Sequence, residues 1–191
     1  PSIAIVAHAQ APYRLQVHRR VAREMPEVEL WSLYTMEQGD QPWVLGQADE
    51  TRPVVFGRGQ TMTAHNPVRD ARADWIKGGR IIRWMKEHGI RAVVAGGYAD
   101  AARMRIIWWC FFHRVPCFIT GDANIACDLA RGLKGFIKRI VVGAVVRCSA
   151  GVLPWGRSGI LYFRKYGSRP DRTWHFPYEP DYSVIESIRP E

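Results

Sequence analysis

The sequence predicts an α/β protein with three layers: an open, mostly parallel sheet with helices on both faces. Short, uninterrupted apolar runs such as Ile3–Ala7 and Ala92–Ala95 are typical of strands buried on both faces of a parallel sheet. Segments with apolar residues at helical spacing alternate with these runs along most of the chain. This alternation favours crossover units, in which each helix returns the chain to the same edge of one sheet.

The first half of the chain begins with the strand Ile3–Ala7 and a helix that Pro26 closes. A second strand is expected at Val28–Tyr34, where apolar and polar residues alternate. Residues 37–73 are rich in Gly, Pro, Gln and Asp, and we expect a long excursion there with one hairpin and a short strand at Val54–Phe56.

The second half continues the alternation of helices and strands. Gly and Asp residues at the segment ends supply plausible caps, such as Asp100 before one of the helices. The expected elements are a helix at Trp75–His88, a strand at Ala92–Ala95, a helix from Asp100 to about His113, a strand at Cys117–Ile119, a helix at Leu129–Cys148, a strand at Gly151–Pro154 and a helix at Gly159–Tyr166 capped by Ser158.

The carboxy-terminal segment divides the chain into a domain and a linker. A turn and another short strand are expected after the helix at Gly159–Tyr166, and Pro177 and Pro180 then stop regular structure. We therefore expect one Rossmann-like domain at residues 1–176, followed by a hinge at residues 177–191 that leads toward a second domain.

Composition limits the classes of partner. The 191 residues include 27 Lys and Arg against 18 Asp and Glu, for a net charge of +9, and 47% of them are hydrophobic. A chain this apolar folds around a core, and its positive charge suits nucleic acid, a phosphorylated substrate or an anionic lipid surface. No specific nucleic acid is expected, because the charge is scattered and no RRM, KH or helix-turn-helix pattern appears.

The spacing and surroundings of the cysteines indicate the redox state of the compartment. They lack CxxC spacing and lie in apolar or helical surroundings, so we expect buried, reduced thiols rather than metal ligands or disulfides. Neither a signal peptide nor an apolar run of membrane-spanning length is visible. We expect a cytoplasmic protein, with a peripheral position at the inner face of the membrane as a further expectation. The four cysteines are Cys110, Cys117, Cys127 and Cys148.

Ligands of open α/β sheets bind beyond the carboxyl ends of the strands. That rule selects four loops, at residues 8–14, 96–100, 120–124 and 154–158, which are all rich in Gly, polar and aromatic residues. The candidate binding residues in these loops are His8, Tyr13, Arg14, Gly97, Tyr98, Asp122, Asn124 and Trp155.

Each candidate offers a specific interaction. Arg14 at a helix N-terminus suits a phosphate or a sugar, and Gly97 lets the backbone approach a ligand closely. The carboxylate of Asp122 suits holding or deprotonating a sugar hydroxyl. His8 is a candidate general base, and the indole of Trp155 offers a stacking wall.

Structural alternatives stand beside these functional interpretations. Asp122 or Asn124 suits capping of the helix that follows, and Asp100 suits a capping role alone. Trp155 and Tyr13 suit packing, and His8 suits a packed or solvated position.

Familiar catalytic motifs are absent from the sequence. The first loop lacks the glycines of a dinucleotide fingerprint, and no P-loop, nucleophile elbow or clustered Cys and His motif occurs. We therefore expect neither a metal nor a cofactor held by this chain.

The long helix predicts a contact with an anionic bilayer. Arg131, Lys134 and Lys138 form a basic stripe, and Val142 and Val146 are expected to face away from the core with it. The opposite face, expected to pack on the sheet, carries Leu129, Leu133, Phe136, Ile137, Ile140, Val141, Ala144, Val145 and Cys148. The preceding helix adds Arg103, Arg105 and the apolar run 106–112 to the outer surface. The alternative is that a neighbouring domain or subunit covers this surface.

Several of these segments resemble the amino-terminal domain of GT-B-fold glycosyltransferases of the large retaining family 4. Pro180 and Thr120 depart from the family pattern, in which Val and Arg are common at these places, and the first loop lacks a Gly-Gly pair. The resembling segments are APYR at Ala11–Arg14, GGY at Gly96–Tyr98, TGDAN at Thr120–Asn124, LP at Leu153–Pro154, YFRKYG at Tyr162–Gly167 and FPYEPD at Phe176–Asp181.

The resemblance implies a two-domain enzyme. The whole enzyme would transfer a sugar from a nucleotide-sugar donor to an acceptor hydroxyl, with retained configuration and without a bound metal. The donor site and the catalytic residues would lie in its own C-terminal domain, which is the expected partner of this one. This chain would bind a carbohydrate or lipid-linked acceptor, with His8, Arg14, Tyr98 and Asp122 on the acceptor side. The alternative is a stand-alone α/β module that binds an anion or nucleic acid without catalysis.

Overall fold

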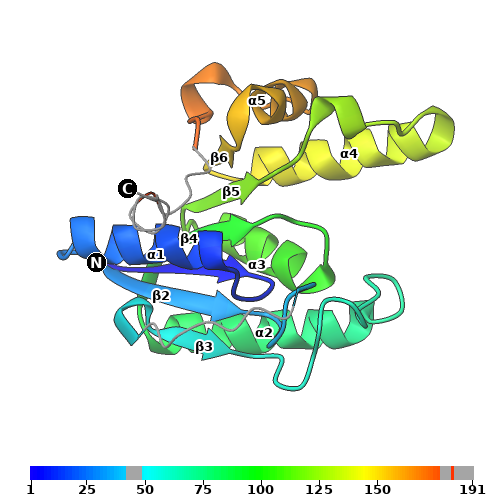
Figure 1. Cartoon of the computed structure of the whole chain (residues 1–191). Coiled ribbons are helices and arrows are strands. Elements are labelled where there is room, and N and C mark those ends of the chain that lie inside the picture. The colour runs from blue at the N-terminus through cyan, green and yellow to red at the C-terminus, as the bar shows by residue number, and fades with distance from the viewer. Residues whose placement is uncertain (42–48, 177–181, 183–191) are drawn as a thin grey trace, which may run out of the picture.

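The computed structural model describes residues 1–41, 49–176 and Tyr182 and has the predicted α/β architecture, a six-stranded parallel sheet in the order β3-β2-β1-β4-β5-β6 (Figure 1). The strands are β1 (Ser2–Ala7), β2 (Glu29–Tyr34), β3 (Pro53–Val55), β4 (Ile90–Gly96), β5 (Cys117–Gly121) and β6 (Gly151–Pro154). The α-helices are α1 (Pro12–Glu24), α2 (Ala71–Glu87), α3 (Ala101–Phe112), α4 (Gly132–Cys148) and α5 (Gly156–Lys165). Single 3-10 turns lie at η1 (Asp49–Thr51), η2 (Ile125–Cys127) and η3 (Pro170–Arg172).

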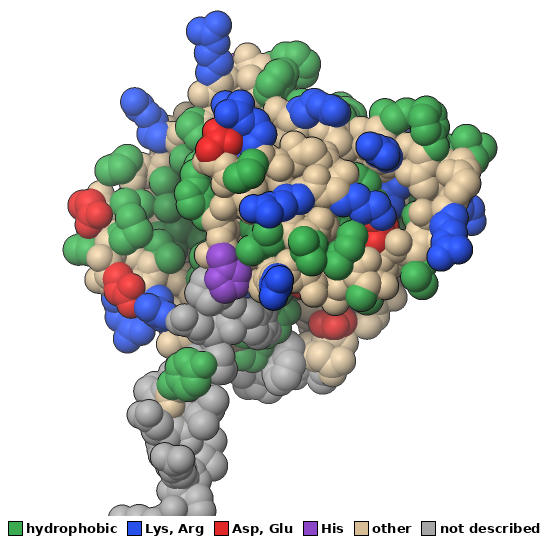
Figure 2. Space-filling view, turned by 90° about the horizontal axis from the view of Figure 1, so that it is seen from above, with side chains coloured by type: hydrophobic (Ala, Val, Ile, Leu, Met, Phe, Trp, Pro, Cys, Tyr) green, Lys and Arg blue, Asp and Glu red, His purple; other side chains and the backbone are tan. Residues whose placement is uncertain are grey.

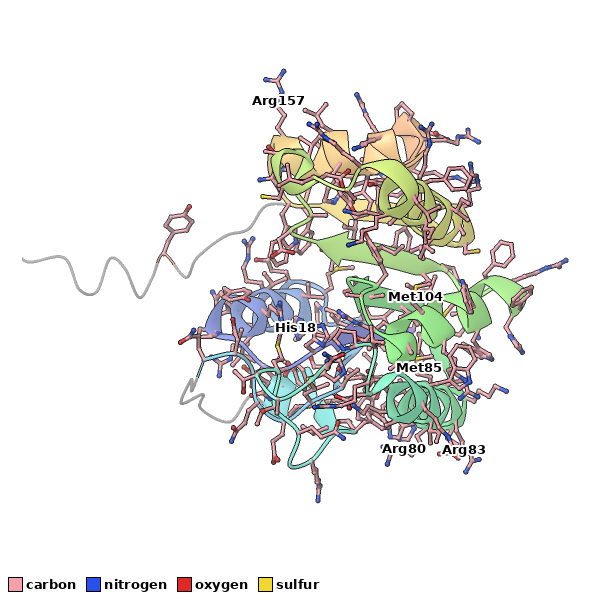
Figure 3. The ribbon with its side chains drawn as sticks, turned by 90° about the vertical axis from the view of Figure 1, so that its right-hand side faces the viewer. His18, Arg80, Arg83, Met85, Met104 and Arg157 are labelled. Atoms are coloured by element: carbon pink, nitrogen blue, oxygen red, sulfur yellow. The ribbon has the colours of Figure 1, made fainter. Side chains whose placement is uncertain are left out.

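Strand order decides which helices share a face. From β1 the chain moves outward to β2 and β3, returns through α2 to β4, and then moves the opposite way to β5 and β6. Because parallel crossovers are right-handed, this reversal places α1 on one face and α2, α3 and α4 on the other, while α5 follows the edge strand β6 and contacts α4 (Figures 1 and 3). The three layers expected from the sequence are therefore present.

The core lies where the central strands meet both helix layers. β1 is paired on both sides, so that Val6 is opposite Leu33 of β2 and Ala95 of β4. These three residues are fully buried, as are Ile106 of α3 and Val145 of α4. Uninterrupted apolar runs thus fill a sheet that is covered on both faces.

The segment between β2 and α2 differs from the expectation in its pairing. The short strand is confirmed as β3, but it pairs parallel with β2, and the described part of residues 37–73 contains no hairpin. The start of α5 also differs: its N-cap is Trp155, so Ser158 lies inside the helix rather than before it. Gly156, the first residue of α5, has a φ of +67°, which glycine tolerates.

The orientation predicted for α4 is wrong. Val142 and Val146, expected outside, are buried against the sheet, whereas Leu133, Phe136 and Ile140 are exposed. Both sides of α4 are apolar, so the spacing of apolar residues did not distinguish them. The whole exposed set is Leu129, Leu133, Phe136, Ile137, Ile140 and Val141.

The cysteine prediction is correct for two residues. Cys110 and Cys117 are buried and Cys148 is partly buried, but Cys127 in η2 is exposed; all four are free thiols. The predicted hinge at residues 177–191, with Pro177, Pro180 and Asp181, lies outside the described residues, apart from Tyr182.

Candidate functional site

A cavity of about 300 Å³ opens at the carboxyl ends of β1, β4 and β5. It lies at the point where the strand order reverses, between β1 and β4, which is where ligands of open α/β sheets bind. We call it the edge cavity. Its lining residues are Ile5, Ala7, His8, Tyr13, Arg14, Val17, His18, Met62, Val94, Gly96, Gly97, Ala99, Arg103, Thr120, Gly121, Asp122, Trp155 and Phe176.

The edge cavity brings together six of the eight residues selected from the sequence. His8, Tyr13, Arg14, Gly97, Asp122 and Trp155 all line it, although they come from four separate loops. This convergence follows from the topology, because every parallel strand ends at the same edge of the sheet.

Tyr98 and Asn124 lie elsewhere. The Tyr98 hydroxyl is 2.7 Å from that of Tyr162 on α5, and the Tyr98 ring packs on the core. Burial raises the pKa of Tyr98 well above its ordinary value, and the hydrogen bond to Tyr162 adds to the shift. Asn124 caps η2, where its side-chain oxygen accepts a hydrogen bond from the Ala126 N–H at 2.8 Å. These two side chains therefore have structural roles.

A buried ion pair forms one wall of the cavity. Asp100 caps α3 by accepting a hydrogen bond from the Arg103 N–H at 2.9 Å, and the Arg103 Nε donates to the same carboxylate at 2.6 Å. Both side chains are only 2% exposed. Arg103 also donates to the Gly96 carbonyl and to Nε2 of His8. One guanidinium thus ties the ends of β1 and β4 to the first turn of α3.

This network holds His8 uncharged. Burial and, after it, the Arg103 charge lower the pKa of His8 to about 3. The charge of Arg103 also keeps the pKa of Asp100 below its ordinary value, against the opposing effect of burial. Because Nε2 of His8 already accepts a hydrogen bond from Arg103, its lone pair is not free to take a proton from a ligand. His8 therefore fits a binding role better than the general-base role considered from the sequence.

Glycine at the end of β4 is required for this geometry. Gly97 has a φ of +86°, a left-handed conformation that side chains disfavour. A Cβ atom there would also lie 3.1 Å from Nη1 of Arg103. Gly97 thus exposes its backbone to the edge cavity and leaves room for the arginine.

Aromatic side chains form another part of the wall of the edge cavity. The Trp155 indole N–H donates to Oγ1 of Thr120 at 2.9 Å, which fixes the ring beside the end of β5. Tyr13 meets Trp155 edge-on, with ring centroids 6.4 Å apart, and the Arg14 guanidinium lies 5.3 Å from the Tyr13 ring centroid. The result is a rigid aromatic surface next to a positive charge.

Asp122 supplies the negative charge of the site. It is exposed at the end of β5, and no described residue donates a hydrogen bond or forms an ion pair to its carboxylate. It is also the only acid among the described residues that line the edge cavity. A ligand hydroxyl would therefore find an unoccupied acceptor there.

His18 of α1 also lines the edge cavity (Figure 3). Its Nδ1 lies 2.8 Å from Oγ of Ser32, and its ring stacks on Tyr34 of β2 at 6.3 Å. Burial, with a smaller effect of Arg14, lowers the pKa of His18 to about 4.

Sequence reasoning missed several lining residues. Arg103 had been placed on the outer surface because it stands among basic and aromatic residues, yet it is buried. Met62 comes from the excursion before α2 and Phe176 from beyond α5. Only the cap position of Asp100, three residues before Arg103, offered a signal for the buried pair.

The basic stripe predicted on α4 is divided in the structure. Lys138 donates to Asp128 at 2.7 Å, and Asp128 also accepts from Lys165 at the end of α5 and from its C-cap residue Tyr166. Lys138 therefore joins α4 to α5, whereas Arg131 and Lys134 are exposed. Among the described residues, no helix is long and apolar enough to span a membrane.

Two solved structures share the fold over most of this chain. UDP-N-acetylglucosamine 2-epimerase overlaps 91% of the chain and 47% of its own length, with a TM-score of 0.58 and 10% sequence identity. The S. aureus MnaA-UDP co-structure overlaps 91% of the chain and 43% of its own length, with a TM-score of 0.55 and 9% identity. The chain thus spans about half the length of these structures. Acinetobacter baumannii MurG overlaps 97% of the chain and 70% of its own, at a TM-score of 0.38 and 10% identity.

These comparisons show a Rossmann-like α/β fold of the kind that GT-B enzymes contain. No family model matches the sequence, and the search of curated proteins gives no match. The membership in retaining family 4 that the motifs suggested therefore stays a prediction.

The edge cavity combines features that suit a small polar ligand with an apolar part. Ile5, Val17 and Val94 give it apolar walls, while Arg14 and Asp122 offer opposite charges at different places on its rim. Apolar walls with a small number of polar and charged groups are typical of small-molecule sites.

Proposed function

We propose that this chain is the acceptor-binding half of a GT-B-type enzyme that acts on a nucleotide sugar. The observation that carries the proposal is the edge cavity, which gathers residues of four loops at the sheet edge facing the place of a second domain in such folds. The fold shared with UDP-N-acetylglucosamine 2-epimerase over about half of that enzyme's length supports this division.

In this proposal the acceptor is a carbohydrate, and a lipid carrier on it would extend from the cavity. The exposed carboxylate of Asp122 accepts a hydrogen bond from the attacking hydroxyl, and Trp155 stacks on the sugar ring. Arg14 binds a phosphate when the acceptor carries one. Retention of configuration and independence of metal are parts of the proposal that rest on the motif resemblance alone.

The donor has a different place. The nucleotide sugar would bind mainly to the enzyme's own C-terminal domain, which would also supply the catalytic residues. This chain itself would hold no cofactor, because its first loop lacks the glycine-rich phosphate cradle. The division of labour therefore predicts weak donor binding by this chain alone.

Isothermal titration tests this division. The probes are UDP-N-acetylglucosamine as donor, and monosaccharides with short prenyl-diphosphate-linked sugars as acceptors. We expect at least one acceptor to bind and the donor to bind weakly. D122N should weaken acceptor binding by about tenfold or more, since a hydrogen bond to a charged group contributes about 1.5–3 kcal/mol.

Glu87, an exposed acid at the C-terminal end of α2, provides the control, because it lies outside the edge cavity at the opposite edge of the sheet. E87Q should leave acceptor binding unchanged. Tight donor binding to this chain without any acceptor binding would contradict the proposal. Binding of DNA or RNA that D122N does not alter would favour the alternative of an anion- or nucleic-acid-binding module.

A further inference from the structure

The exposed side of α4 carries a continuous apolar surface. Leu133, Phe136, Ile137, Ile140 and Val141 project from successive turns and are 42–74% exposed. We call this set the α4 strip. Spacings of three and four residues place these side chains along one line of the helix, opposite the buried Val142 and Val145.

Basic residues form a groove beside the strip. Arg139 and Arg147 stand on α4, two helical turns apart, and face Arg164 near the end of α5 across two adjoining hollows of about 300 and 250 Å³. We call these three residues the arginine groove. Gly143 lies between the two α4 arginines, and a side chain there would crowd the Arg147 guanidinium and the Tyr166 carbonyl.

The charges of the groove are unbalanced. Among the described residues, no carboxylate pairs with Arg139, Arg147 or Arg164, and all three are exposed. α4 contains four Lys and Arg and α5 contains three, while neither helix contains an Asp or Glu. Figure 2, which views the molecule from above the α4 and α5 end of Figure 1, shows Lys and Arg beside hydrophobic side chains there.

We propose that the α4 strip and the arginine groove together dock this protein on an anionic phospholipid bilayer. The strip inserts among the acyl chains near the headgroups, and the arginines bind lipid phosphates beside it. An apolar line flanked by unpaired cations is the pattern that interfacial helices present to such a surface. The residues differ from those expected on α4 from the sequence, because the helix packs on the sheet through its other side.

Other occupants fit the surface less well. A second copy of the chain would bring two groups of unpaired arginines together, which like-charge repulsion opposes. Nucleic acid would neutralise the arginines but would leave the Leu, Ile and Phe side chains of the strip against a polar backbone.

The position of the strip relates docking to the edge cavity. Residues 122–131 lead from the carboxyl end of β5, at the cavity rim, to the first turn of α4. The exposed Leu129 and Leu133 therefore lie toward the same edge of the sheet as the cavity. A docked molecule would hold the cavity near the membrane surface. The docking itself does not depend on the reaction proposed above.

Vesicle co-sedimentation tests the proposal. The probes are phosphatidylcholine vesicles with and without phosphatidylglycerol, and we expect binding only when phosphatidylglycerol is present. The triple variant R139Q/R147Q/R164Q should weaken that binding on the order of a hundredfold, since each arginine near an anionic surface contributes about fivefold. F136S/I140S should also weaken it, because it removes inserted apolar surface.

Matched controls separate docking from net charge. R23Q/R58Q/R91Q removes the same charge from exposed positions outside α4 and α5, and V68S removes an apolar side chain that is 87% exposed. Both should bind phosphatidylglycerol vesicles within about threefold of the wild type, since only residues near the surface interact strongly. All variants change exposed residues, and a melting temperature close to that of the wild type is the criterion that each variant is folded.

The proposal is wrong if the wild type does not bind phosphatidylglycerol vesicles, or if the arginine variant and its control lose vesicle binding equally. It is also wrong if F136S/I140S binds these vesicles as the wild type does. A wild-type dimer that F136S/I140S loses, without any vesicle binding, would contradict it as well. Hydrogen exchange provides a second readout, in which phosphatidylglycerol vesicles should slow exchange in residues 133–141 but not in α1.

Discussion

His8 and His18 are held neutral at pH values where a free histidine takes up a proton. Burial is the main cause for both, and it lowers the pKa to about 3 for His8 and to about 4 for His18. The unfolded chain keeps the ordinary value of about 6.5. Below that pH the unfolded state binds a proton that the folded state refuses, so stability falls as the pH falls from about 6.5 toward the folded pKa.

His18 gives the clearer test, because it is 3% exposed and is not linked to the Asp100–Arg103 pair. Between about pH 7 and pH 5 its titration should lower the free energy of unfolding by about 2 kcal/mol. H18N removes the titrating ring and should reduce the pH dependence by that amount, measured by urea unfolding at both pH values.

H113N is the control, since His113 is exposed at the end of α3. It should leave the pH dependence as in the wild type. An unchanged pH dependence in H18N would show that the ring titrates normally in the folded protein.

The composition around Arg103 does not indicate that this residue is buried. It stands in a helix with Arg105 and a run of aromatic residues, a composition that suits an outer surface. In the structure Arg103 is buried because Asp100, one helical turn before it, neutralises its charge. Arg105 instead is only partly buried, with its guanidinium 5.0 Å from the Trp75 ring centroid. Apart from the cap residue Asp100, nothing in the sequence distinguishes the two arginines; their tertiary contacts do.

At the scale of elements, the rotation of α4 about its own axis decides which of its side chains are exposed. Its apolar residues occupy most of its circumference, so the sequence predicted a helix but not its rotation. The larger side chains, Leu133, Phe136 and Ile140, were assigned to the core by their helical spacing. The sheet instead packs on the smaller valines, because a helix close to the last strands leaves room only for short side chains.

A pair of substitutions tests this rotation. V142A should lower the free energy of unfolding by about 2 kcal/mol, since it leaves a cavity at a position that is only 3% exposed but was expected outside from the sequence. I140A should change it by less than about 0.5 kcal/mol, since that side chain is 55% exposed. Urea unfolding of the two variants at one pH provides the comparison. The opposite order of the two losses would restore the orientation expected from the sequence.

At the scale of the whole molecule, an open, mostly parallel sheet was inferred from the alternation of apolar runs and helices, and the six-stranded parallel sheet confirms it. The four loops chosen at strand ends follow from the same rule, and residues of all four reach the edge cavity. The residues that sequence reasoning missed, Met62 and Phe176, come from segments without regular spacing. Nothing local in those segments indicates which part of the sheet they cover.

The central claim is that the carboxyl edge of the sheet binds the sugar acceptor. Hydrogen exchange measured with and without the tightest-binding acceptor from the titration panel tests it most directly. The account predicts slower exchange at residues 8–14, 96–101, 120–124 and 155–158 together, with little change in β3 and α2. Protection confined to another part of the chain, or no protection by any acceptor that binds, would contradict it.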